Sequence, residues 1–372
     1  MSLFSFRKPS FKNLYIEMAM LFKLIRTIIN SYIGNDPLPE YQSVLLMFIG
    51  ECLAGFFEVI VQYRQKAYTK KNQNKITKIE FFPVFLILLF TVSDCFFSIN
   101  YFYTIFNEND DFPFITIIFE FFYTTLIYNY WIQKSLKKHS YVGFGLIIFG
   151  IIIQMNWNNL NSFWFFLYYQ PQSIVFAFFD ILLKWIMDLK FYSPYMVTFI
   201  SGCFGFVISF SLYITSFYGN VSWIDELLNN KNKNKLFYQF FTNPGGFIKC
   251  LVYILTSCGY NIFSNYLTKV FSPSHRVISD SASIILYEII NGFVKKNDTS
   301  VQTYIINLFG YIITVIGMMV YFEIIVLNFY GLNSNTDDEI NKRGINEKIE
   351  IEKIPLSSLL NEPEQNGRSF SF

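Results

Sequence analysis

Long apolar runs alternate with short polar stretches along most of the chain. A helix needs about 20 mostly apolar residues to cross the hydrocarbon core of a bilayer. Ten segments satisfy this requirement, and we expect each to be a membrane-spanning helix: 13–33, 41–63, 81–106, 112–133, 139–155, 162–185, 193–218, 246–268, 273–294 and 303–329. The pattern therefore predicts an all-α integral membrane protein.

The remaining chain is polar and lies mostly at the two ends. Residues 1–12 are expected to form a cytosolic N-terminal arm ahead of a ten-helix domain over 13–330. Residues 331–372 are rich in charged residues and poor in aromatic ones, which is typical of disordered segments. We expect them to form a disordered cytosolic tail.

Composition supports the membrane class and excludes several others. The chain of 372 residues is 53% hydrophobic and 21% aromatic, and only 15% of it is charged, against about a quarter in soluble domains. A net charge of +2 gives no reason to expect a nucleic-acid partner. The five cysteines lie in apolar segments and the two histidines are far apart, so neither a disulfide framework nor a metal site is predicted, and no cofactor is expected.

Basic residues are distributed unequally between the two sets of loops. Fifteen lie in one set, which includes the N-terminal arm and the 64–79 loop, and five lie in the other. Because positively charged loops stay in the cytosol, both termini are predicted to be cytosolic. The N-x-[ST] sites at Asn220 and Asn297 fall on the opposite, lumenal side and are candidates for N-glycosylation.

The ninth predicted span carries a polar stripe on one helical face, formed by Arg276, Asp280, Ser283, Tyr287 and Asn291. Ionisable residues at membrane depth normally face a bundle interior or a wet cavity. Arg276 and Asp280 are one helical turn apart and are predicted to neutralise each other. In the alternative, Arg276 extends to the cytosolic headgroups and Asp280 merely caps it.

Other acids also lie within predicted spans. Glu51 is near the middle of the second span, on one face with Glu58, and no basic residue lies within a helical turn of Glu51. Asp94 lies in the third span. Glu120 and Glu323 are further acids with no partner visible in the sequence.

Two spans contain cations. In the sixth, Asp180, Lys184 and Asp188 follow at four-residue steps near the cytosolic end. We expect a structural pair with an interfacial anchor there and not a substrate site. Lys23 and Arg26 line one side of the first span. A partly interfacial helix and a helix with a functional polar face explain these two cations equally well.

Small residues recur at four- or three-residue spacing in two spans, which favours close helix packing. They are Ser201, Gly205 and Ser209 in the seventh span and Gly310, Thr314 and Gly317 in the tenth.

Three motifs carry a resemblance to a known family. MFIGEC at 47–52, SPYMVTFISGCFGFVI at 193–208 and SHRVISDS at 274–281 are similar to segments of the second, seventh and ninth helices in the F branch of solute carrier family 35. Ten helices with both ends cytosolic resemble the drug/metabolite transporter superfamily, to which that branch belongs. The resemblance covers about residues 13–330.

The resemblance implies two inverted five-helix repeats, 13–155 and 162–329, around a central cavity that moves solute by alternating access. Residues that match the branch's polar positions would line the substrate or ion pathway: Glu51, Asp94, Arg276, Asp280 and Ser281.

The chain departs from the branch at two places where a cavity arginine would stand. Ala282 and Ser283 replace a Leu-Arg pair, and the fourth span supplies Glu120 in place of an arginine. These departures argue against an anionic substrate.

The sequence thus predicts a secondary active transporter for a small polar organic solute, nucleotide-sugar-like or another metabolite. The membrane would be that of a lysosome or vacuole, an endosome or the Golgi. No phosphate-binding loop is present, so exchange or a proton gradient would drive movement. The alternative is a non-transporting receptor or assembly subunit on a degenerate transporter fold. No enzymatic site is predicted, and homodimer formation is left open.

Overall fold

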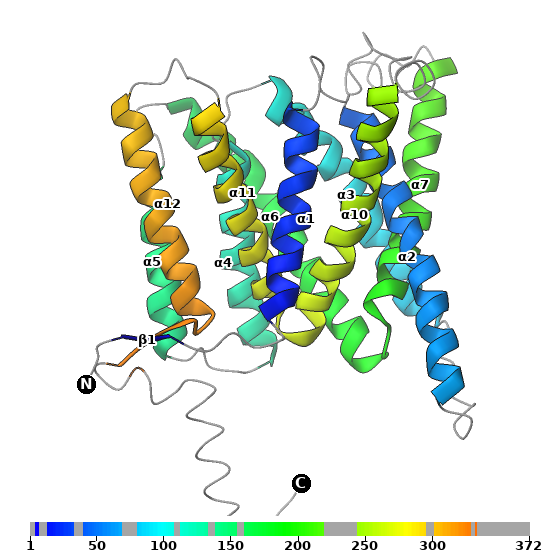
Figure 1. Ribbon diagram of the computed structural model, residues 1–372, viewed down its shortest axis with the longest axis horizontal. Helices are drawn as coiled ribbons and strands as arrows, with labels where there is room; N and C mark the ends of the chain where they lie inside the picture. Colours follow the sequence, from blue (N-terminus) through cyan, green and yellow to red (C-terminus); the bar gives the residue numbers. More distant parts are fainter. Residues whose placement is uncertain are drawn as a thin grey trace, which may run out of the picture.

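The computed structural model describes residues 4–6, 13–32, 40–68, 80–107, 112–132, 138–154, 160–218, 244–294, 301–328 and 332. Ten helices run alternately in opposite directions through this part of the chain (Figure 1). They are α1 (Asn13–Tyr32), α2 (Glu40–Tyr68), α3 (Phe81–Asn107), α4 (Phe112–Ile132), α5 (Lys138–Gln154), α6 (Leu160–Leu189), α7 (Pro194–Tyr218), α10 (Pro244–Val270), α11 (Pro273–Val294) and α12 (Val301–Tyr321). Each predicted apolar segment overlaps one of them, and the prediction of an all-helical protein is confirmed.

Four helices in the described part are long and apolar enough to cross a membrane. These spans are Ser43–Tyr63, Phe81–Ile99, Pro194–Thr215 and Pro244–Val270. Large apolar side chains such as Phe56, Val59 and Phe81 are more than half exposed, as side chains in contact with lipid would be. The chain is therefore a membrane protein.

The end of the last predicted span is wrong. It was expected to continue to residue 329, but α12 ends at Tyr321. Glu323 adopts a left-handed backbone conformation with φ of 59°. Its N–H donates to the Val320 carbonyl, and the Ile324 N–H donates to the Met319 carbonyl. This Schellman arrangement stops the helix although the apolar sequence continues.

A two-stranded ribbon follows this turn. Strand β2 (Ile325–Leu327) pairs antiparallel with β1 (Phe4–Phe6), with Ser5 opposite Val326. The Leu327 N–H donates to Nε2 of His139 at the start of α5, over 3.2 Å. We call the end of the bundle that carries this ribbon the ribbon face. The chain thus approaches its first helix and leaves its last one at the same face (Figure 1).

Glycines bring two helix pairs into close contact. A Cβ added at Gly317 of α12 would lie 2.7 Å from the backbone N of Ile147 in α5. A Cβ at Gly202 of α7 would lie 2.5 Å from the backbone N of Cys52 in α2, and Gly205 packs against the Phe48 ring. The predicted close packing at Gly205 and Gly317 is confirmed.

Candidate functional site

Helix α11 places two charged residues in the interior of the bundle. Arg276 Nη1 lies 2.8 Å from Oδ1 of Asp180 on α6, and the two side chains are 15% and 2% exposed. The Arg276 side chain therefore does not extend to the headgroups. It neutralises an acid on a neighbouring helix.

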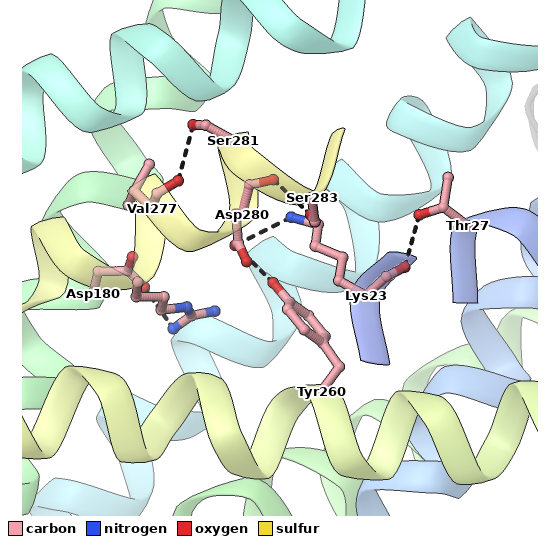
Figure 2. A network of polar contacts seen from close by, with 9 residues as sticks. Lys23, Thr27, Asp180, Tyr260, Val277, Asp280, Ser281 and Ser283 are labelled. Atoms are coloured by element: carbon pink, nitrogen blue, oxygen red, sulfur yellow. Dashed lines mark hydrogen bonds and ion pairs between the residues drawn. The ribbon is translucent and has the colours of Figure 1, made fainter. Parts of the chain in front are cut away.

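Asp280, one turn further along α11, binds a different helix. Its Oδ2 lies 3.2 Å from Lys23 Nζ on α1 and accepts a 2.7 Å hydrogen bond from the Tyr260 hydroxyl on α10 (Figure 2). Lys23 Nζ lies 5.3 Å and Arg26 Cζ lies 4.7 Å from the centre of the Tyr260 ring. Such cation–π contacts stabilise buried cations. Three helices thus meet around Tyr260.

The predicted pair between Arg276 and Asp280 is wrong. Residues one turn apart share a helical face, but each of these side chains finds a closer partner on another helix. The predicted role of Asp180 is also wrong. Lys184 and Asp188 do form the expected pair, at 3.0 Å, whereas Asp180 is 1% exposed and belongs to the interior.

Glu51 is buried in α2 and is only 4% exposed. Its Oε1 accepts a 2.6 Å hydrogen bond from Asn261 Nδ2 on α10. Its Oε2 is buried with no hydrogen-bond partner within the described residues. The Ser201 hydroxyl lies close to this carboxylate and also accepts a 3.1 Å bond from Thr91. A buried carboxylate oxygen without a partner is costly, so this position is expected to be functional.

Asp94 of α3 lies close enough to Glu51 for their charges to interact. It accepts a 3.1 Å hydrogen bond from Ser98. Neither carboxylate has a cation at ion-pair distance among the described residues, although Arg26 and Arg276 act on both from further away.

The structure separates two further predicted positions from this cluster. The Ser281 hydroxyl donates to the Val277 carbonyl on its own helix, over 2.9 Å, and is directed away from Lys23 and Tyr260 (Figure 2). Glu58 lies nearer the ribbon face, where its carboxylate accepts hydrogen bonds from Gln62 and Ser193.

The charged cluster as a whole combines more acids than cations. We define it as Glu51, Asp94, Glu120, Asp180 and Asp280 with Lys23, Arg26 and Arg276. Together with Tyr260 and Asn261, these residues come from seven helices: α1, α2, α3, α4, α6, α10 and α11. No group of three or more potential metal ligands occurs in the described ranges. The arrangement is suited to holding a polar or charged solute, or a proton.

Tyr260 and Asn261 were missed by the sequence reasoning. A signal was present, because Ser257, Asn261, Ser264 and Thr268 form a polar stripe at helical spacing along α10. The two candidate glycosylation sites, Asn220 and Asn297, lie outside the described residues, as does the predicted tail except for Leu332.

Comparisons with known proteins bear on the fold alone. No protein-family model matches the chain, and no curated protein matches it. A solved structure described as "Crystal structure of protein" superposes with a TM-score of 0.55 at 10% identity, covering 84% of this chain and 96% of that chain. At so low an identity, this likeness extends to the arrangement of helices and not to function.

Proposed function

We propose that the chain is a secondary active transporter that moves a small polar organic solute across an endomembrane. The charged cluster is the observation that carries this proposal. Each ionisable residue at membrane depth costs about 2.5–3.5 kcal/mol on insertion scales and normally faces a solute or ion route. Five acids and three cations gathered from helices far apart in sequence are far more than two structural pairs require.

We also propose the drug/metabolite transporter fold, with repeats over 13–155 and 162–329. Exchanging the two halves replaces α1–α5 by α6, α7, α10, α11 and α12 in order. The packed pairs α5/α12, α2/α7 and α4/α11 then map onto themselves. The pair α1/α11 maps onto α4/α6, and α2/α10 maps onto α3/α7. Two inverted repeats would produce this exchange symmetry.

Within the cluster, the two ion pairs and the two unpaired acids would have different tasks. Arg276–Asp180 and Lys23–Asp280 join α11 to α6 and to α1. Because α1 and α6 are the first helices of the two repeats, solute competing for these pairs would act on both halves. Glu51 and Asp94 would bind a coupling proton or a polar group of the solute.

The test is uptake into proteoliposomes that contain the purified protein. The panel would include a nucleotide sugar, a nucleoside, an amino acid and an organic amine, each measured with and without a pH gradient. The proposal expects protein-dependent accumulation of at least one class. Absence of uptake for every class, from protein that remains folded, would contradict it.

The second candidate is a non-transporting receptor or assembly subunit. The observation that favours it is that four of the buried charges already neutralise each other in pairs. Such a protein could bind solute, but it would not exchange labelled solute for unlabelled solute across the bilayer, so the same vesicles separate the two functions.

A further inference from the structure

The connection between α6 and α7, residues 190–193, is bound to other helices at the ribbon face. Tyr192 is 3% exposed. Its hydroxyl oxygen accepts a 3.1 Å hydrogen bond from the backbone N–H of Glu80, directly before α3. Its carbonyl oxygen accepts one from Lys269 Nζ, at the end of α10, also over 3.1 Å. One residue therefore joins α3 and α10 to the connection.

The neighbours of Tyr192 add two more attachments. Lys190 Nζ lies 2.5 Å from the Glu80 carboxylate. The Ser193 hydroxyl donates to the Glu58 carboxylate on α2 and accepts a 3.0 Å bond from the Met196 N–H, which caps α7. The connection thus holds α2, at Glu58, together with the ends of α3, α7 and α10 at one face.

The backbone of the connection is strained. Phe191 has φ of 57°, a left-handed conformation that is unfavourable for any residue with a Cβ. Its side chain is 76% exposed, so packing of the Phe191 ring does not impose this conformation. Phe191 lies two residues after the end of α6, and the attached residues 190, 192 and 193 flank it, as is typical where surrounding contacts maintain an unfavourable backbone conformation.

We propose that residues 190–193 are a latch that keeps the ribbon face closed in one state of the transport cycle and releases in the other. This inference rests on the proposed function, because a latch has a role only if the bundle opens alternately to its two faces. In this proposal, the bonds of residues 190–193 belong to the state in which the ribbon face is closed.

The latch shares helices with the charged cluster. On α6, Asp180 holds Arg276, and Lys184, one turn later, donates to the Lys269 carbonyl over 2.6 Å. On α10, Asn261 binds Glu51, and Lys269 binds Tyr192. Solute that draws Arg276 away from Asp180 would therefore act on α6, the helix that leads into the latch. Binding of solute would then favour the state in which the latch is released.

The test measures access to α10 from the ribbon face. Ser264 is 1% exposed, and its hydroxyl has no hydrogen-bond partner among the described residues, so Ser264→Cys is a conservative reporter between Asn261 and the latch. A membrane-impermeant thiol reagent would be added to sealed vesicles of known orientation. Mass spectrometry of the peptide that contains position 264 would give the labelling rate.

Tyr192→Phe removes only the hydroxyl that accepts the Glu80 N–H. It should speed labelling from the ribbon face by about fivefold, the change expected for losing one net hydrogen bond from the closed state. Lys269→Met removes the donor to the Tyr192 carbonyl and should have a similar effect. Tyr63→Phe is the matched control, because Tyr63 is 77% exposed on α2, and it should leave the rate unchanged.

Unchanged labelling in Tyr192→Phe and Lys269→Met would overturn the latch. Faster labelling from both faces would also overturn it, because that result indicates general loosening of the bundle. The assay needs no solute. Suppose that Tyr192→Phe speeds labelling only from the ribbon face, but that the protein transports no solute. This result would contradict the proposed transport function and would support the latch.

Discussion

The ion pair between Arg276 and Asp180 gives the sharpest prediction about stability. Asp180→Asn keeps the shape of the side chain but leaves the Arg276 guanidinium, 15% exposed and 2.8 Å from the lost charge, without its counter-ion. Breaking a buried pair in this way costs about 3–5 kcal/mol. At about 2 °C per kcal/mol for a large domain, the midpoint of thermal unfolding should fall by roughly 6–10 °C.

Arg276→Gln should be similarly destabilising, because it leaves Asp180 charged and only 2% exposed. The double variant strands no charge, so it should lose clearly less stability than the two single losses added together. The assay is thermal unfolding of the wild type, both single variants and the double variant in the same detergent. Additivity within about 0.5 kcal/mol would mean that the residues are not coupled and would refute the assigned pair.

The same cycle distinguishes the pair seen in the structure from the pair expected from the sequence. Coupling between Lys23 and Asp280 should be comparable to that between Arg276 and Asp180. Coupling between Arg276 and Asp280, which share a helix but form no ion pair within the described contacts, should be smaller than either. If the coupling energy between Arg276 and Asp280 were the largest of the three, the pair predicted from the sequence would be supported instead.

Two further predictions concern packing and topology. Gly317→Ala places a Cβ 2.7 Å from the Ile147 backbone and should lower the free energy of unfolding by about 1–3 kcal/mol. Gly145→Ala is the control, because its Cβ meets nothing within 4 Å, and it should be neutral or stabilising. Equal unfolding midpoints for the two variants would contradict the close contact at Gly317. Asn220 and Asn297 should carry glycans, so a glycosidase-sensitive mass shift should disappear in the Asn220→Gln/Asn297→Gln variant, and modification of a sequon inserted in the 64–79 loop would overturn the orientation.

The helices could be predicted from the sequence, because in a membrane protein the length of an apolar run is enough to indicate a spanning helix. The end of α12 could not, because a left-handed backbone at Glu323 and two hydrogen bonds stop the helix inside a sequence that remains apolar. The ribbon between residues 4–6 and 325–327 joins opposite ends of the chain, and no local pattern in the sequence connects them.

The charged residues of the site could be found from the sequence, but their partners could not. Helical periodicity reports neighbours on one helix and therefore favoured Arg276 with Asp280. The observed partners, Asp180 and Lys23, depend on which helices pack together. The partner of Glu51 also depends on helix packing: it is Asn261 on α10, an uncharged residue that the search for ionisable side chains did not single out.

If the charged cluster moves a solute, Glu51→Gln should stop that movement. The substitution keeps the hydrogen bond that Asn261 can donate and removes only the ionisable group. Glu17→Gln, the same change at an exposed position of α1, is the control. For the solute that the wild type accumulates in proteoliposomes, uptake should be abolished, or its response to a pH gradient lost, in Glu51→Gln and retained in Glu17→Gln. Wild-type uptake by folded Glu51→Gln at every pH would mean that the cluster around Glu51 does not move the solute.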